Sequence, residues 1–285
     1  MKRVACVYNQ SSGSALSADD IRDLFAAHKV TADCFDVTDG ETISQQLQGK
    51  KYEAIVAVGG DGTVNATARL AVQHSLPLGV IPAGTLNHFA KDLGLPLQAA
   101  KAVVAIVKGK LLAIDYATVN GELFINNSSI GIYPSTVLRR ERKSRLFKWP
   151  ATAVAFVAAL FRHHTIHAHI TTPTETWEHR SPLIFVGNNE YQVEKVGFTK
   201  RETLSRGQLF LYAVQAARPM ALLLLALLSL IGMRRRSTDF RSVSSGPITI
   251  KSSKASVNVA IDGEIVRLHF PLDYKLHAQG LKVYK

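Results

Sequence analysis

The sequence predicts an α/β domain with a doubly wound parallel sheet, followed by a β-rich domain. In the first third of the chain, short apolar runs alternate with helix-forming segments, an order typical of parallel sheets covered by helices. After about Asp115 the chain changes to short alternating runs separated by Gly, Pro, Asn and Ser, which favour antiparallel strands. We therefore expect an α/β domain over residues 1–115, with 276–285 returning to it, and a β-rich, sandwich-like domain over residues 116–275.

The elements of the first domain follow from its apolar runs and cap signals. Ser17 and Asp20 have the spacing of a capping box, which predicts a helix running to about His28. The other elements expected here are strands at Val4–Tyr8, Cys34–Val37, Ala54–Val58 and Leu78–Ile81, and helices at Glu41–Leu47, Thr67–Val72 and Leu86–Leu93.

The second domain is expected to be built from short strands. An alanine-rich helix is predicted at Ala151–Phe161, and the final strand, Leu281–Tyr284, is the segment expected to return to the first domain. The other strands expected in this domain are Thr118–Asn120, Leu123–Ile125, Thr165–Thr171, Leu183–Val186, Leu209–Val214, Ile248–Ile250 and Val257–Ile261.

A glycine-rich stretch, Gly59-Gly60-Asp61-Gly62-Thr63-Val64-Asn65, joins a buried strand to a helix. Glycines allow close backbone approach, and the N–H groups at a helix start attract anions, most often phosphate. Asp61 would be repelled by a phosphate unless a cation lay between them, so it indicates a Mg²⁺-nucleotide. A glycine-rich turn without a ligand is the alternative interpretation.

Loops that follow parallel strands meet at one edge of the sheet. Asn9, Thr38, the Gly59–Gly62 turn and Gly84-Thr85 each follow a predicted strand. We therefore expect them to line a single ligand crevice.

The net charge of +12 calls for an anionic partner. Basic and aromatic residues alternate over 139–149, and Arg234–Arg236 with Arg241 form a second basic cluster. Contact with an anionic membrane surface and simple solvation are both open interpretations. Nucleic acid is not expected, because the sequence contains neither a recognition fold nor a stacking platform.

Cellular location is predicted to be cytoplasmic. The chain enters a strand almost at once, so no signal peptide is expected. Cys6 and Cys34 lie in apolar runs and are expected to be core thiols in a reducing compartment. The apolar stretch Met220–Ile231 is too short to cross a hydrocarbon core of about 30 Å, which favours a buried helix.

Two motifs give the sequence a family resemblance. Gly59-Gly60-Asp61-Gly62-Thr63 is also found in NAD kinases and phosphofructokinases, whereas Pro82–Ala90 followed by Leu93-Gly94-Leu95-Pro96 resembles the diacylglycerol kinase catalytic-domain family, which is related to sphingosine kinases. Asn9–Gly13, Phe124–Asn127 with Ile130-Gly131, Val186–Asn188 and Ile261-Asp262-Gly263-Glu264 resemble further family segments in family order.

This resemblance implies an α/β nucleotide domain of the NAD kinase and phosphofructokinase type and a β-sandwich domain. ATP is expected on the glycine loop, with Mg²⁺ held through Asp61 and the nucleotide, and Glu264 is expected to be the base that deprotonates a lipid hydroxyl. On its own, Asp262-Gly263 would be read as a hairpin turn. The residues expected around the nucleotide are Asn9, Thr38, Gly59, Gly60, Asp61, Gly62, Thr63, Asn65 and Thr85.

The sequence departs from the family pattern at Gln10, which replaces a proline, and at His88, Arg206 and Phe210, which replace acidic residues. In similar proteins acidic groups there help hold a structural metal, so such a metal is in doubt here. The hypothesis is that Arg206 supplies the cation instead and pairs with Asp61 or a neighbour; a solvated turn arginine is the alternative.

The predicted function is an ATP- and Mg²⁺-dependent lipid kinase acting on diacylglycerol or a related lipid alcohol. It would work peripherally at the inner face of the membrane, and a homodimer is left open. An NAD kinase-like small-molecule kinase is one alternative, and a nucleotide- or lipid-binding regulator without turnover is another.

Overall fold

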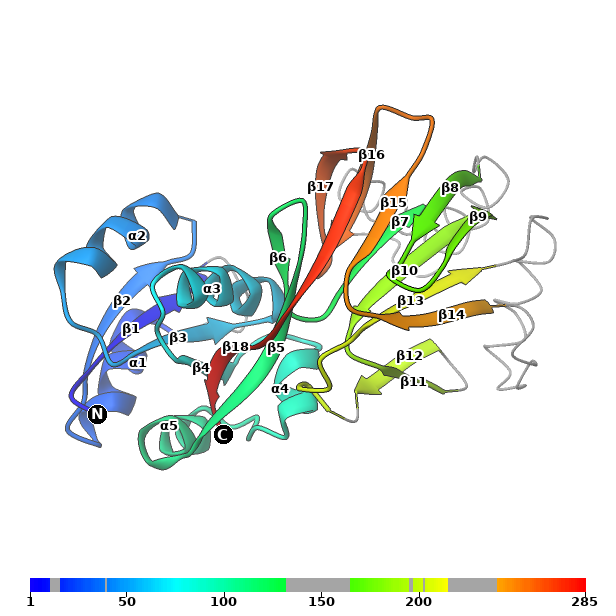
Figure 1. Ribbon diagram of the computed structural model, residues 1–285. Helices are drawn as coiled ribbons and strands as arrows, with labels where there is room; N and C mark the ends of the chain where they lie inside the picture. Colours follow the sequence, from blue (N-terminus) through cyan, green and yellow to red (C-terminus); the bar gives the residue numbers. More distant parts are fainter. Residues whose placement is uncertain (11–15, 39, 132–164, 195–196, 202, 215–239) are drawn as a thin grey trace, which may run out of the picture. The chain divides into compact units, whose positions relative to one another are not determined.

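A computed structural model describes residues 1–10, 16–38, 40–131, 165–194, 197–201, 203–214 and 240–285 (Figure 1). The chain divides into two compact units. The first comprises Met1–Tyr116, Thr203–Ser205 and Ala278–Lys285, and the second comprises Ala117–Glu202 and Arg206–His277. The short segment Thr203–Ser205 was not expected in the first unit.

The first unit is a parallel sheet with helices on both faces, as expected for a doubly wound fold. Its strands run in the order β2-β1-β3-β4, and the end of β18 pairs with β4 through Val283 and Leu78. Figure 1 shows α2 and α3 on one side of this sheet and α1 and α5 on the other. The elements are β1 (Arg3–Tyr8), α1 (Ala18–Ala26), β2 (Thr31–Asp36), α2 (Gly40–Gly49), β3 (Ala54–Gly59), α3 (Asp61–Gln73), β4 (Leu78–Pro82), α4 (His88–Leu93) and α5 (Ala99–Lys108).

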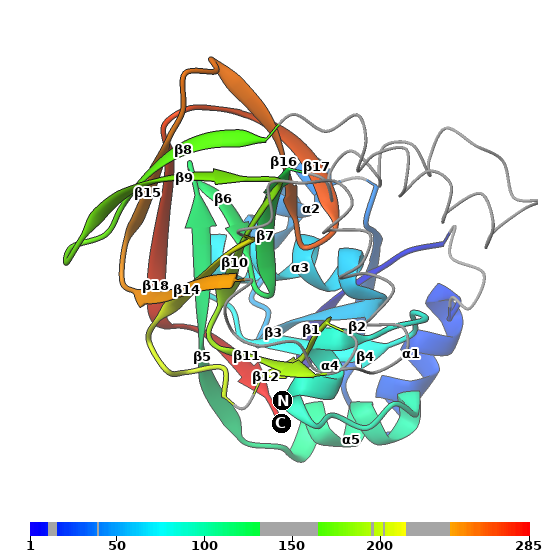
Figure 2. The ribbon, with the colours of Figure 1, turned by 90° about the vertical axis from the view of Figure 1, so that its right-hand side faces the viewer.

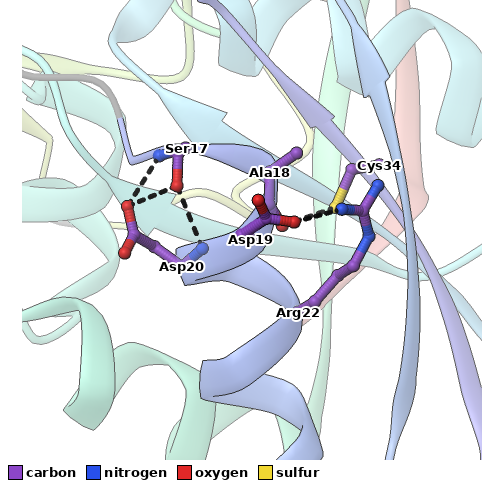
Figure 3. Close-up of polar contacts among 6 residues, drawn as sticks. All are labelled: Ser17, Ala18, Asp19, Asp20, Arg22 and Cys34. Atoms are coloured by element: carbon purple, nitrogen blue, oxygen red, sulfur yellow. Dashed lines mark hydrogen bonds and ion pairs between the residues drawn. The ribbon is translucent and has the colours of Figure 1, made fainter.

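Helix α1 begins with the predicted capping box (Figure 3). The Ser17 hydroxyl accepts the N–H of Asp20 at 3.1 Å, and the Asp20 carboxylate accepts the N–H of Ser17 at 3.0 Å. The hydrogen bonds from Ser17 lower the pKa of Asp20. Ile21 and Phe25 are the buried residues of α1, and they pack into the core of this unit.

Cys6 and Cys34 are free thiols on neighbouring strands, where they are register partners. Cys6 is buried, and its burial raises the pKa of its thiol. Cys34 is half-buried, and its Sγ donates to the carbonyl of Ala18 at 3.6 Å (Figure 3). Both therefore lie against the core of the sheet.

Two features of the helices differ from the sequence-based expectations. Helix α5 was not predicted, yet its Ala102, Val103 and Ile106 are core residues. Helix α4 begins at His88 rather than Leu86, because Asn87 adopts a left-handed conformation with φ 51°.

The second unit is β-rich, with its core between two sheets. One sheet has the order β14-β13-β10-β7-β16-β17. The other contains β15, β8 and β9, seen side by side in Figure 2, together with β18 and the β5–β6 hairpin. The strands are β5 (Leu111–Val119), β6 (Glu122–Phe124), β7 (Asn127–Gly131), β8 (Ile166–Thr171), β9 (Thr176–Ser181), β10 (Leu183–Asn188), β11 (Tyr191–Glu194), β12 (Gly197–Arg201), β13 (Leu209–Val214), β14 (Phe240–Ser245), β15 (Ile248–Lys251), β16 (Ser256–Ile261), β17 (Glu264–His269) and β18 (Leu272–Tyr284).

The core of this unit confirms the β-sandwich-like prediction. Inward residues of both sheets form one apolar cluster, with Ile170 and Ile250 from one sheet and Val186 and Val259 from the other, all with no exposed surface. Strand β8 alternates buried and exposed residues along its length, as expected for a strand covered on one face. The strands β5 and β18 each run from one unit into the other.

Several predicted segments lie outside the described residues. They are the helix at Ala151–Phe161, the apolar stretch Met220–Ile231, the basic residues of 139–149 and Arg234–Arg236. Within the described ranges, no helix has the length and apolar character needed to cross a membrane.

Candidate functional site

Four loops follow neighbouring strands at one edge of the parallel sheet in the first unit. Because β2, β1, β3 and β4 run parallel, their carboxyl ends lie together. Asn9 follows β1, Thr38 follows β2, the glycine loop follows β3, and Gly84-Thr85 follows β4. These residues therefore follow strand ends at one edge of the sheet, and the ligand crevice that they are expected to line stays a prediction.

The glycine loop and the loop after β4 touch backbone to backbone. A Cβ on Gly84 would lie 2.4 Å from the Cα of Gly60, closer than Cβ atoms come to other atoms in proteins. The N–H of Ala83 donates to the carbonyl of Gly59 at 2.9 Å, which ties the two loops together. Glycine is thus required at position 84 by the close approach of the two chains.

Side chains on either side brace this contact. A Cβ on Gly59 would lie 2.5 Å from the Oγ1 of Thr63, so the buried Thr63 closes one side of the loop. On the other side, the amide of Asn87 accepts the N–H of Gly84 at 3.0 Å and donates to its carbonyl at 2.7 Å. The loop geometry is therefore held without a ligand.

Asp61 begins helix α3 and also contacts the start of helix α4. One of its carboxylate oxygens accepts the N–H of His88 and the other accepts the N–H of Phe89, each at 3.3 Å. A carboxylate at the first N–H groups of a helix satisfies donors that have no partner within the helix. The contact uses the backbone of His88, so the histidine found at this position does not disturb it.

Asn65 has a buried donor without a partner. Its side chain is 1% exposed, and its Nδ2 has no hydrogen-bond partner among the described residues. Its Oδ1 accepts from the Nε of Arg69 at 3.4 Å. An unpaired buried N–H is costly, so this donor in the second turn of α3 marks a place for an acceptor group.

Asp36, at the end of β2, fixes the loop that contains Thr38. Its carboxylate accepts the hydroxyl of Thr38 at 2.6 Å, the N–H of Thr38 at 2.9 Å and the N–H of Gln10 at 3.2 Å. Hydrogen bonds from Thr38 lower the pKa of Asp36. Asp36 therefore links the loop after β1 to the loop after β2.

In the second unit, Asp262 and Gly263 form the two-residue turn between β16 and β17. Their φ angles are 47° and 93°, and Ile261 and Glu264 are register partners. Positive φ at both positions is the geometry that Asp-Gly hairpins favour. Glu264 is the first residue of β17 and is exposed. The predicted hairpin turn is therefore formed by the residues of the Ile261-Asp262-Gly263-Glu264 motif.

The side chain of Asp262 turns inward, although the residue as a whole is only half-buried. Its carboxylate accepts the N–H groups of Ile125, Asn126 and Asn127 at 2.8, 2.9 and 2.8 Å. Burial raises the pKa of Asp262 to about 6, although these three donors and the charge of Arg201 favour the ionised form. This carboxylate ties the turn to the segment between β6 and β7.

Arg206 pairs within the second unit. Its guanidinium forms an ion pair with Glu190 and lies 5.8 Å above the ring of Phe210. The backbone N–H of Arg206 also donates to the Oδ1 of Asn189 at 2.9 Å. The ion pair found for Arg206 is therefore with Glu190 of its own unit, whereas its pairing with Asp61 or a neighbour stays a prediction.

The part of the chain described here contains no cluster of three or more His, Cys, Asp or Glu residues that could hold a metal ion. Asp61 fits instead a Mg²⁺ ion that is held jointly with a bound nucleotide. Mg²⁺ is commonly bound by one or two carboxylates together with substrate phosphates. The glycine loop, the free donor of Asn65 and the lone carboxylate of Asp61 together fit a Mg²⁺-nucleotide.

Four residues of these sites were missed from the sequence: Asp36, Asn87, Asp262 and Arg201. Asp two positions before Thr is a signal for a side-chain turn, so Asp36 could have been found. Asn87 and Asp262 lie inside motifs but had no assigned role. No sequence pattern indicates Arg201, whose partners are far away along the chain.

Residues 3–119 match the family described as Diacylglycerol kinase catalytic domain. Two curated relatives, each called "Probable lipid kinase YegS-like", come from Yersinia enterocolitica and Pectobacterium atrosepticum. They are 36% identical over 143 and 146 residues, which is 48% of this chain and 48% of each relative. The match thus spans about half the length of these relatives.

A solved structure described as a diacylglycerol kinase from Bacillus anthracis str. Sterne has the same fold along the whole chain. Its TM-score is 0.70 at 22% identity, over 100% of this chain and 97% of that one. The glycine loop, the Pro82–Ala90 motif and the loops at the strand ends all lie within the matched residues 3–119. The similarity to the diacylglycerol kinase catalytic domain therefore covers residues 3–119, which make up most of the first unit and the start of the second.

Proposed function

We propose that the protein is an ATP- and Mg²⁺-dependent lipid kinase that phosphorylates the hydroxyl of diacylglycerol or a related lipid alcohol. The observation that carries this proposal is the close backbone approach of Gly60 and Gly84, which fixes the glycine loop at the start of helix α3. The names of the curated relatives support a lipid as the acceptor.

The nucleotide is assigned to the first unit. The N–H groups of Gly60, Gly62 and Thr63 would bind phosphate oxygens at the start of α3, where the helix dipole also favours an anion. The unpaired Nδ2 of Asn65 would donate to the nucleotide. The other contacts are assigned to Asn9, Thr38, Gly59 and Thr85.

Asp61 is the residue assigned to hold Mg²⁺ together with the phosphates, and the ion would neutralise charge on the transferred group. The two N–H groups at 3.3 Å occupy one side of each carboxylate oxygen. A carboxylate oxygen has two lone-pair sites, so this helix contact leaves room for a cation.

Glu264 is assigned as the general base. Its carboxylate would accept the proton of the lipid hydroxyl while the hydroxyl oxygen bonds to the γ-phosphorus. The bond from that phosphorus to the bridging oxygen then breaks, and ADP leaves. A base placed for this proton transfer contributes about 10²- to 10⁴-fold in rate.

Peripheral contact with the inner face of the membrane is part of the proposal. Among the described residues, Arg241 lies 4.2 Å above the ring of Trp177 and pairs with Glu175 at 2.7 Å. A tryptophan stacked by an arginine suits the headgroup region of an anionic membrane. A homodimer is compatible with this proposal, which does not require one.

The test is incubation of the purified protein with Mg·ATP and a total membrane-lipid extract, followed by mass spectrometry. A newly phosphorylated lipid supports the proposal and identifies the acceptor. Phosphorylation of NAD with all lipids unchanged would show instead an NAD kinase-like enzyme. ATP binding without transfer to either acceptor would show a regulator without turnover, an outcome consistent with the departures at His88, Arg206 and Phe210.

A further inference from the structure

The segment between β6 and β7, Ile125–Asn127, is held from both sides by charged side chains. On one side, the carboxylate of Asp262 accepts the three successive N–H groups at 2.8 to 2.9 Å. On the other side, the guanidinium of Arg201 donates to the carbonyl of Ile125 at 2.6 Å and to the Oδ1 of Asn126 at 2.7 Å. A negative group therefore binds the donors of this bend and a positive group binds its acceptors.

Arg201 is among the largest fully buried side chains of the described chain, with 1% exposure. It also donates to the carbonyl of Asn188 at 3.2 Å and lies 5.4 Å above the ring of Tyr191. Arginine is almost never buried unless its charge is paired and its donors are satisfied. The carboxylate of Asp262 supplies the opposite charge through space, since Arg201 favours its ionised form.

The turn that precedes Glu264 is connected to this bend through Asp262, which makes two contacts with it. The N–H of Asp262 donates to the carbonyl of Asn127 at 2.9 Å, while its carboxylate accepts from the bend. Glu264 follows two residues later and faces Ile261 across the hairpin. The position of Glu264 thus depends on a bend whose acceptors are held by Arg201.

We propose that Arg201 and Asp262 are positioning residues that hold Glu264 in place through the segment Ile125–Asn127. This inference rests on the proposed function for its catalytic consequence and deepens it. Arg201 affects Glu264 indirectly, because it holds the Ile125–Asn127 bend, which in turn holds the Asp262-Gly263 turn. The planar fork of arginine bridges Ile125 and Asn126 at once, which a lysine cannot do.

The first test is amide hydrogen exchange in the Arg201→Met variant. We expect exchange to rise at least tenfold both at Ile125–Asn127 and at Glu264, with Arg201→Lys giving a smaller rise of the same pattern. The matched control is Arg267→Met, an exposed arginine of the same hairpin whose Nε donates to Ser256. Unchanged exchange at Glu264 in the Arg201 variants would overturn the proposal.

The second test is steady-state lipid phosphorylation by the same variants. We expect kcat to fall at least tenfold in Arg201→Met and in Asp262→Asn, with the KM for ATP unchanged, because the nucleotide is assigned to the other unit. An unchanged kcat beside a raised exchange at Glu264 would overturn the positioning role. If the unmodified protein transfers no phosphate to any lipid, the proposed function fails, and the exchange result alone then decides whether Arg201 holds the turn.

Discussion

The nucleotide site assigned to the first unit and the general-base site assigned to the second, called the two half-sites below, are held by different kinds of contact. In the first unit, the glycine loop and the loop after β4 meet backbone to backbone, and neutral side chains such as Thr63 and Asn87 brace them. In the second unit, the turn with Glu264 is held by ionised side chains that bind backbone groups. The first half-site should therefore be sensitive to added volume, and the second to altered charge.

This difference suits what each half-site is assigned to bind or do. A phosphate chain is large and carries several charges, so it needs open space and exposed N–H groups. A general base must be held within about 0.5 Å of the position from which it accepts one proton. Two carboxylates are exceptions in the first half-site: Asp36 binds the loop that contains Thr38, and Asp61 both contacts helix α4 and is assigned to Mg²⁺.

Substitutions of Asp61 should separate these two roles, and they carry the largest expected effect. Asp61→Asn keeps one of the two oxygens that accept from the start of α4 but loses the charge, so phosphoryl transfer should become undetectable while stability falls less than in Asp61→Ala. Asp61→Ala should lose transfer and also about 1 to 2 kcal/mol of stability, because both N–H contacts are removed. Assays of transfer and of Tm on both variants check this, and full activity in either would remove Asp61 from the metal role.

Added volume in the first half-site is the next largest effect. Gly84→Ala places a methyl group against the backbone of Gly60, and overpacking of this kind costs about 1 to 3 kcal/mol. We expect the Kd for ATP, measured by calorimetry, to rise about tenfold or more. Gly49→Ala in the same unit is the control, because nothing lies within 4 Å of the added Cβ. Equal ATP affinity in the two variants would contradict the backbone contact as the basis of the site.

Altered charge in the second half-site should appear in the pH dependence of stability. The pKa of Asp262 is raised from 3.8 to about 6 in the folded protein. The folded chain therefore binds this proton more tightly than the unfolded chain, and the carboxyl favours folding most below about pH 4. This contribution is lost as the pH rises towards about 6 and is constant above that value.

Asp262→Asn removes the titrating group, so the corresponding slope should disappear. Urea unfolding from pH 4.5 to 7.5, followed by tryptophan fluorescence, measures the difference. We expect the unmodified protein to lose on the order of 1 to 2 kcal/mol relative to the variant over this interval. Parallel pH profiles for the two proteins would show that the carboxylate is not held as the structure indicates.

The sequence predicted the fold class because that prediction depends on local patterns. The unbroken apolar run of β3 and the alternation in β8 are visible in the order of residues alone. Helix α5 was missed because its alanines and valines, next to Pro96, give no clear cap signal. The start of α4 was misplaced because the left-handed Asn87 is fixed by its contacts with Gly84, which the sequence does not display.

The candidate site divides in the same way. Gly59–Gly62 and Glu264 were assigned to the site because motifs mark them. Arg201 was not found, because its partners Ile125 and Asn126 are 76 and 75 positions away. The ion pair of Arg206 with Glu190 was not predicted, because the sequence gives no distance between side chains. The sequence therefore did not predict the long-range polar contacts, which the structure shows.

The most direct test of the account is the Glu264→Gln variant, measured for ATP affinity and for lipid phosphorylation in one preparation. Because the nucleotide is assigned to the first unit and proton transfer to the second, the account predicts an unchanged Kd for ATP and a loss of transfer of about 10²- to 10⁴-fold. Glu178→Gln, on the exposed face of β9, is the control and should keep both properties. Lipid phosphorylation at the unmodified rate by Glu264→Gln would contradict the account.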